Sequence, residues 1–203
     1  MKKLVVFGTA LLLCASAAFA TNFTPSIGIG TQASIDIVHS EIGSLEDTDS
    51  FGNWSGFLFL DAVFAELDVS IGRYSYPGDL NGINMGFGIY GKYPIALGSR
   101  FSLFPMLGVD YQLMLSANHD DTSLSGNAKD DVRDKFNAFR IKAGLGGDFS
   151  LTEALYLRGE FLWGFKFKSQ GERDLVDAYD KLGIDASIVT HGPTFKIGLG
   201  YKI

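Results

Sequence analysis

The last nine residues of the chain constrain its fold more than any other stretch. From Phe195 to Ile203, apolar side chains alternate with glycine and lysine, so one face of a strand is wholly apolar and the other is polar. A water-soluble sheet buries its apolar face, and that face becomes less apolar near the chain end, whereas here it stays apolar to the final residue. The pattern predicts the closing strand of a barrel with lipid outside and a polar interior.

The first twenty residues predict a secretory signal peptide. Lys2 and Lys3 precede an apolar run from Leu4 to Leu13, and Ala18-Phe19-Ala20 places small residues at the two positions that determine cleavage. Cleavage after Ala20 would leave residues 21–203 as one barrel domain. A lipoprotein anchored at Cys14 is the alternative, although Leu13 is bulky where that signal has a small residue.

Composition narrows the class of protein further. Loss of Lys2 and Lys3 takes the formal net charge from −6 to −8, and an acidic exported chain argues against a nucleic-acid partner. Loss of Cys14 leaves no cysteine for a disulfide or a thiolate metal site. No stretch after residue 20 approaches the length of an apolar transmembrane helix, so any membrane span must consist of strands.

Period-two alternation recurs in eight segments, which predicts an all-β fold: a closed eight-stranded antiparallel transmembrane β-barrel. The predicted strands are 26–38, 54–60, 63–71, 82–93, 101–115, 138–149, 155–168 and 195–203. The residues expected to face lipid include Ile27, Ile83, Leu107, Ile141, Phe161 and Leu199. In the hairpin about Asp61-Ala62, Val63 should face outward and Phe57, Phe59 and Phe64 inward. Pro105 cannot donate to a ladder and predicts a bulge.

The connections alternate in length. Asp61-Ala62, Pro94–Arg100 and Ser150–Ala154 are short, whereas 39–53, 117–135 and 170–192 are long, polar loops. This asymmetry is typical of short periplasmic turns and long external loops, with both termini in the periplasm. The helical spacing of Leu175, Val176, Tyr179 and Leu182 predicts a short helix in the last external loop. Two aromatic girdles are expected, formed by Tyr93, Phe101, Phe149 and Tyr201 beside the short turns and by Trp54, Phe139, Phe167 and Phe195 beside the long loops.

The mature chain resembles the small eight-stranded outer-membrane families of the OmpA-barrel, OmpX and OmpW kind. The short motifs Gly91-Lys92-Tyr93-Pro94 and Leu60-Asp61-Ala62 resemble those of spirochaete surface barrels. The final strand is similar to the C-terminal insertion signal of outer-membrane proteins, with Ile203 where that family usually has Phe. The resemblance implies a bacterial cell outer membrane location after export through the periplasm. These families share a fold and not one function. A soluble barrel such as a lipocalin is the rival fold, and it would place the apolar face inside.

The inward faces of the predicted strands carry acids and bases in equal number. They are Asp36, Glu66, Asp68, Lys92, Asp110, Arg140, Lys142, Asp148, Arg158, Glu160, Lys166 and Lys196. Because buried charges are costly unless they are paired, this balance predicts a salt-bridged lumen. Arg140 is expected to pair with Asp110 and Glu160, and Asp36 faces the strand of Lys196. Removal of Arg140 should cost ~3–5 kcal/mol.

No motif in the chain marks a catalytic, cofactor or metal site. His39 and His191 lie at the outer ends of strands that adjoin in a closed barrel, so a paired-histidine metal or catalytic site is weighed against isolated rim histidines. The aspartates of 120–134 lack EF-hand spacing, which favours a solvated acidic loop over a calcium site. Neither a nucleophile motif nor His-Glu-x-x-His occurs.

These observations predict a non-enzymatic integral outer-membrane barrel whose surface-exposed loops have a structural or surface-interaction role. The alternative is a narrow OmpW-like channel for small or apolar solutes. The expected partner is outer-membrane lipid, with no nucleic acid and no cofactor, and the barrel is expected to be a monomer. The sequence identifies no partner of the external loops.

Overall fold

The computed structural model describes residues 24–76, 80–119, 122–123, 126, 133 and 136–203. The predicted signal peptide and most of the connection at 120–135 lie outside these residues. Within the described chain, strands dominate and one helix is resolved, α3 (Gln170–Lys181). No helix in these described ranges is long and apolar enough to cross a membrane.

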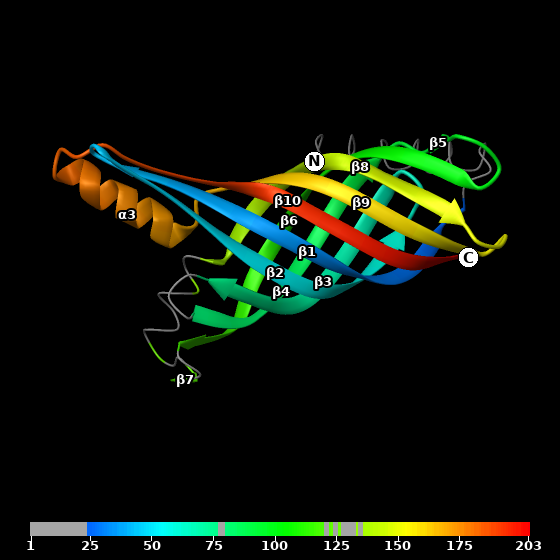
Figure 1. Ribbon diagram of the computed structural model, residues 1–203, viewed down its shortest axis with the longest axis horizontal. Coiled ribbons are helices and arrows are strands. Elements are labelled where there is room, and N and C mark those ends of the chain that lie inside the picture. Colours follow the sequence, from blue (N-terminus) through cyan, green and yellow to red (C-terminus); the bar gives the residue numbers. More distant parts are fainter. Residues whose placement is uncertain (1–23, 77–79, 120–121, 124–125, 127–132, 134–135) are drawn as a thin grey trace, which may run out of the picture.

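The strands close into a ring (Figure 1). Its members are β1 (Ser26–Ile42), β2 (Leu45–Asp61), β3 (Ala65–Tyr76), β4 (Leu80–Lys92), β6 (Phe101–His119), β8 (Ala138–Ser150), β9 (Leu155–Lys166) and β10 (Ala186–Lys202). Each pairs antiparallel with both neighbours, and β1 closes the ring against β10. Two short strands, β5 (Ile95–Ala96) and β7 (Thr122–Ser123), pair with the ends of β6. The predicted eight-stranded antiparallel barrel is confirmed.

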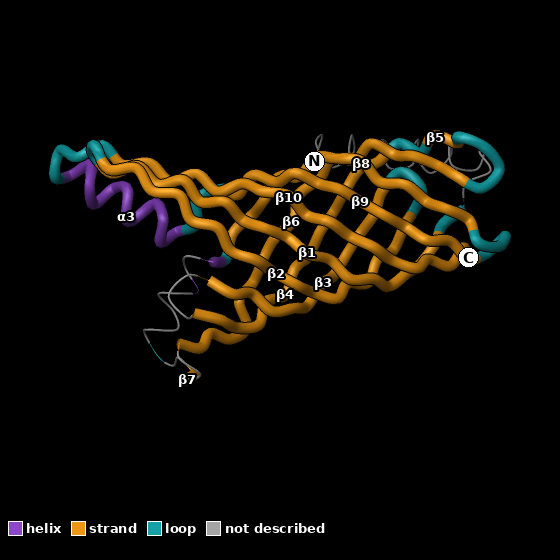
Figure 2. The backbone as a smooth tube through the Cα atoms, in the orientation of Figure 1, coloured by secondary structure: helices purple, strands orange, loops and turns teal. Residues whose placement is uncertain are grey.

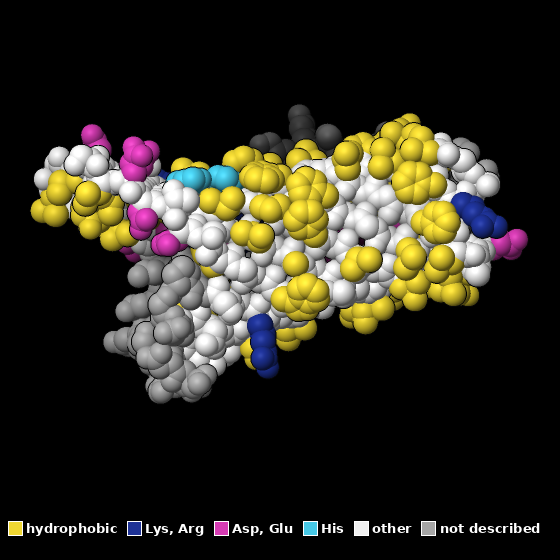
Figure 3. Space-filling model, viewed as in Figure 1, with side chains coloured by type: hydrophobic (Ala, Val, Ile, Leu, Met, Phe, Trp, Pro, Cys, Tyr) yellow, Lys and Arg dark blue, Asp and Glu magenta, His cyan; other side chains and the backbone are white. Residues whose placement is uncertain are grey.

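The wall has the predicted inside and outside. The six residues expected to face lipid are all exposed, with 40–57% of their surface accessible. Their sequence neighbours point inward and are buried, so along β9 exposed and buried residues alternate. The same alternation over neighbouring strands produces the apolar outer band in Figure 3. An inverted barrel of the lipocalin type is therefore excluded.

The two ends of the barrel differ as expected. The short connections 62–64, 93–100 and 151–154 lie at one end, together with the C-terminus (Figure 1). The backbone amide of Ile203 donates to the carbonyl of Pro25 there, at 2.9 Å. The longer connections and α3 lie at the other end. We call the end with the C-terminus the short-turn end and the end with α3 the long-loop end.

The predicted loop at 39–53 is wrong, because both strands continue through it. β1 and β2 pair without interruption to Ile42 and Leu45, and Gly43, with φ of 61°, makes the tight turn between them. β10 pairs with the other edge of β1 up to Ala186, so the predicted loop 170–192 also contains the start of that strand. Polarity on both faces marks where a strand leaves lipid, and it does not end a strand whose backbone stays paired.

These extensions form a projection beyond the barrel, here called the blade (Figure 2). It consists of residues 37–42 of β1, 45–51 of β2 and 186–189 of β10, with α3 against β10. β3 leaves β2 after Gly52, and β9 leaves β10 after Thr190, so only three strands reach this far. The predicted helix is confirmed, and it begins with a capping box between Ser169 and Glu172.

Two local predictions are corrected. Pro105 lies in regular register with Leu145, and the irregularity falls at Ile83/Asn84 instead. The Tyr93 amide, just beyond the end of β4, donates to the Pro105 carbonyl. The Pro105 nitrogen points to the same side as this carbonyl, where β4 has ended, so no β4 residue requires an amide donor there. Val63, expected outside, has φ of 73° in the turn and is buried, with 4% exposed. Phe64 lies in the same turn and is half-buried, whereas Phe57 and Phe59 are inside as predicted.

Candidate functional site

The lumen is occupied by ion-paired side chains centred on Arg158. This guanidinium, on β9, is 1% exposed and donates to Asp61 and Glu66 at 2.5 Å and to Asp148 at 2.7 Å. Lys92 on β4 reaches two of the same carboxylates, Asp61 at 2.5 Å and Glu66 at 3.1 Å. Strands on opposite sides of the ring are thus bridged through the lumen.

Four further cations lie along the lumen toward the long-loop end. Lys196 pairs with Asp68 and lies 3.4 Å from Glu160. Lys142 pairs with Asp110 at 2.5 Å. Arg140 forms a two-pronged pair with Asp36 at 2.5 and 2.6 Å. Lys166 pairs at 2.9 Å with Glu172, which comes from α3. The structure therefore places all twelve of the predicted lumen residues inside the barrel and in ion pairs.

The expected partners of Arg140 are corrected by these distances. Asp110 is its direct cross-strand neighbour, yet Arg140 crosses the lumen to Asp36, and Asp110 pairs with Lys142. Lys196 likewise pairs with Asp68 and not with Asp36. An eight-stranded interior is about as wide as its side chains are long, so opposite strands compete with adjacent ones for each charge.

Sequence reasoning missed two members of the network. Asp61 was assigned to a turn, but it accepts from Lys92 and Arg158 and also from the Val63 amide at 2.7 Å. The inward set Ser55, Phe57 and Phe59 continues by two to Asp61, and that parity could have identified it. Glu172 had no comparable signal, because its position depends on how α3 folds back over β10.

Aromatic rings line the same space and contact the cations. The Arg158 guanidinium lies 4.6 Å from the ring centroid of Phe59 and 5.0 Å from that of Phe104. Lys196 Nζ lies 4.6 Å from the Tyr90 ring. Such contacts stabilise a desolvated cation. They explain why large rings point inward in a barrel whose interior is otherwise charged.

Glycines opposite these rings make the packing possible. A Cβ on Gly146 would lie 2.1 Å from the Phe104 ring, and one on Gly200 would lie 2.1 Å from the Tyr156 ring. Each ring thus occupies the space that the absent side chain of its glycine leaves in the lumen. The interior is packed by these complementary sizes as well as by charge.

A closed ring of tilted strands with an apolar outside, a charged inside, short turns at one end and long loops at the other defines a narrow class. Residues 7–202 match the family described as outer membrane protein beta-barrel domain. The chain belongs to this family. It is an integral β-barrel of the bacterial outer membrane, as expected from the sequence. A search of curated protein sequences found no significant match.

The chain is similar to solved structures of outer-membrane barrels at low sequence identity. Neisserial surface protein A is 10% identical, with a TM-score of 0.50 over 86% of this chain and 97% of that one. The N-terminal β-barrel domain of Pseudomonas aeruginosa OprF is 10% identical, with a TM-score of 0.42 over 85% and 97%. The attachment invasion locus protein Ail of Yersinia pestis is 11% identical, with a TM-score of 0.42 over 89% and 100%.

Membership of the outer-membrane family orients the barrel, because such barrels have short turns in the periplasm and long loops outside. On this basis the blade is predicted to project outward from the cell. It is strongly acidic, with Glu41 exposed on β1 and Glu46, Asp47 and Asp49 exposed on β2. Its tip is apolar, with Leu45 75% and Leu182 74% exposed. Figure 3 shows this acidic region beyond the apolar band.

The two histidines predicted to be neighbours are in contact at the base of the blade. The ring centroids of His39 and His191 are 5.2 Å apart and stacked, and Trp163 stacks 5.6 Å from His191. They face outward where the blade joins the barrel wall, with His39 exposed and His191 half-buried. Aromatic rings at that level suit a membrane interface. Among the residues that the structure describes, no three metal-ligating side chains gather.

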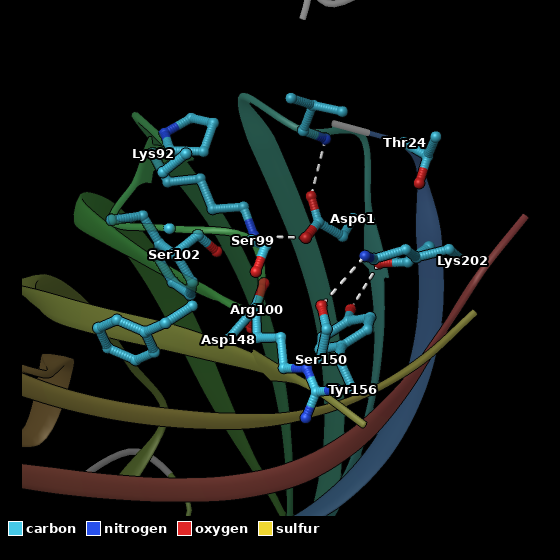
Figure 4. A pocket seen from close by; sticks show the side chains of 17 residues that line it. Thr24, Asp61, Lys92, Ser99, Arg100, Ser102, Asp148, Ser150, Tyr156 and Lys202 are labelled. Atoms are coloured by element: carbon cyan, nitrogen blue, oxygen red, sulfur yellow. Dashed lines mark hydrogen bonds and ion pairs between the residues drawn. The ribbon is translucent and has the colours of Figure 1, made fainter. Parts of the chain in front are cut away.

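A vestibule of about 300 Å³ opens at the short-turn end (Figure 4). Asp61, Lys92 and Asp148 form its floor and belong to the lumen network. Arg100 and Lys202 line its wall, and Lys202 Nζ lies 3.3 Å from Ser150 Oγ. The vestibule brings solvent as far as the Arg158 cluster.

Proposed function

We propose that this protein is a non-enzymatic outer-membrane barrel with a plugged lumen, whose blade is a contact surface outside the cell. The blade carries this proposal. Three strands continue past the last barrel pairs at Gly52–Ser75 and Thr190–Lys166, where lipid no longer requires them. A barrel that served only to conduct would have no use for this length of ordered sheet.

The chemistry of the blade favours a cationic partner. Its exposed acids, including Glu46, Asp47 and Asp49, surround an apolar tip at Leu45 and Leu182. Complementary charge steers association and selects partners. A polypeptide with apolar side chains flanked by lysine or arginine fits this surface better than an anionic lipid or polysaccharide.

The plugged lumen rests on the ion pairs and rings that cross it. Arg158 alone connects β9 with β2, β3 and β8. A narrow channel for small or apolar solutes is the competing function, and it would need this cluster to open. Export by cleavage after Ala20, a monomeric state and contact of the outer band with outer-membrane lipid belong to the same proposal.

Shortening the blade tests the contact role. Deleting residues 39–42 and 45–48 removes four residues from each strand, which keeps the Gly43-Ser44 turn and the inward–outward parity. Cells displaying this variant should lose adhesion to surfaces coated with cationic protein, and cells with the wild type or the variant should adhere equally poorly to anionic surfaces. Equal adhesion of wild type and variant to every surface would overturn the contact role.

A further inference from the structure

One arginine points out of the barrel wall toward the surrounding lipid. On β3 the outward-facing residues Leu67, Val69 and Ile71 are 44–54% exposed, and the next residue on this face is Arg73, which is also exposed. Among the outward-facing positions of the eight ring strands, as far as the structure describes them, Arg73 is the only lysine or arginine. A cation on the lipid face is costly at the bilayer midplane and costs little near the headgroups, so the level of Arg73 decides its role.

Arg73 lies at the long-loop edge of the apolar band, where the outer face of the wall becomes polar. Its cross-strand neighbours are Trp54 on β2 and Ile83 on β4, and both are exposed. One row closer to the long loops, the outward-facing residues of β3 and β4 are Ser75 and Asn81, which pair with each other. Tryptophan and basic side chains at the end of an apolar wall are typical of a membrane–water interface. The guanidinium therefore lies at the level of lipid headgroups.

A hollow of about 440 Å³ lies beside Arg73 on the outer face of β3, β4 and β6. Its other polar side chains are Ser75, Asn81, Ser116 and Asn118. The extra residue of β6 at the Ile83/Asn84 register shift turns Ser116 to this face, where its hydroxyl accepts from the Ile83 amide at 3.2 Å. None of the described residues that line the hollow is acidic. One cation and several neutral hydrogen-bonding groups without a carboxylate favour an anion.

We propose that this hollow binds the phosphate of a membrane lipid headgroup, with Arg73 as its cation. A guanidinium presents N–H donors in a fork that matches two phosphate oxygens, and hydroxyl and amide groups supply further donors. Within the described part of the chain, no side-chain hydrogen bond or ion pair engages the guanidinium of Arg73.

The wall beside the hollow favours a lipid over a free phosphate ion. Toward the middle of the barrel, the residues next to Arg73 and Ile83 on the same face are Ile71 and Met85, which pair with each other. The acyl chains of a lipid bound at Arg73 would cover this apolar surface, whereas a free ion would not. The inference rests on the proposed contact of the outer band with lipid, and it depends neither on the blade nor on the plugged lumen.

Native mass spectrometry of the mature barrel refolded in an uncharged detergent tests the site. Dioleoyl phosphatidic acid and dioleoylglycerol carry the same acyl chains and differ in the phosphate. The wild type should bind phosphatidic acid more tightly, and Arg73→Gln should weaken that binding about fivefold without changing the binding of dioleoylglycerol. Arg100→Gln makes the same change at an exposed arginine of the short-turn end, so it is the matched control and should retain wild-type affinity.

A second variant distinguishes the hollow from general attraction between charges. Asn81→Leu leaves the net charge unchanged and removes an amide from the hollow, so it should weaken phosphatidic acid binding by a smaller factor than Arg73→Gln. Equal affinity of the wild type and either variant, or an equal loss in Arg100→Gln, would overturn the site. Displacement of the lipid by an equal concentration of inorganic phosphate would show a site for a free anion and overturn the lipid. Dioleoylglycerol binding reports contact of the outer band with lipid separately, so each proposal can fail without the other.

Discussion

At the scale of single residues, the lumen is stabilised by charges that are paired across it. Buried ion pairs contribute little net free energy, but removal of one member leaves an uncompensated charge. The Arg140–Asp36 pair connects β8 to β1 through the barrel, and both side chains are 8% exposed. Its two hydrogen bonds also fix the separation of these strands.

Arg140→Met should therefore lower the free energy of unfolding by ~3–5 kcal/mol, because it leaves the buried Asp36 carboxylate without its cation. The double variant Arg140→Met/Asp36→Asn should recover part of this loss, because no unpaired charge remains. Guanidinium unfolding in detergent measures both. Arg100→Ala, at an exposed site of the vestibule, is the control and should change stability by less than about 0.5 kcal/mol. A loss no larger for Arg140→Met than for Arg100→Ala would refute the role of the pair.

The glycines give a second prediction at this scale. Gly146→Ala should destabilise by ~1–3 kcal/mol, because the added Cβ meets the Phe104 ring and the core is already packed. Gly159→Ala, on the neighbouring strand, is the matched control, since no atom lies within 4 Å of its Cβ position. Equal stability of the two variants would show that the lumen is loosely packed.

At the scale of elements, the strands of the barrel wall could be predicted from the sequence and the ends of the blade could not. Lipid forces apolar side chains onto alternate positions, and that pattern predicts each wall strand and its inward charges except Asp61. Beyond the lipid both faces of β2 meet water, so Thr48 and Asp49 resemble a loop although their backbone is paired. The ion pairs could not be assigned either, because they depend on which strands face each other across the ring.

The topology makes a prediction at this scale. Protease added to intact cells should cut in the connections at 120–137 and 167–185 and spare 93–100 and 151–154, which face the periplasm. Residues 40–50 should resist cleavage, because they are paired as strands. Mass spectrometry of the fragments reads out the sites, with permeabilised cells as the control in which the short turns become accessible. Cleavage first at the short turns in intact cells would reverse the orientation.

At the scale of the whole molecule, the vestibule, the ion-pair network and the blade lie at successive positions along the barrel axis. The vestibule lies at the short-turn end, the network around Arg158 and Lys196 fills the middle, and the blade extends from the long-loop end. The barrel wall depends on this network, because the lumen is narrow and the charged side chains that point into it must be paired. The blade needs the wall, because only β1, β2 and β10 carry it and each is fixed in register by the ring below.

Planar-bilayer recording on the refolded mature barrel tests the plugged lumen most directly. Because paired charges and packed rings occupy the interior, the wild-type protein should show no steady conductance. Arg158→Ala, which removes the cation that Asp61, Glu66 and Asp148 share, should show open events. A large, steady, open conductance of the wild-type protein would contradict the plug and establish the channel instead.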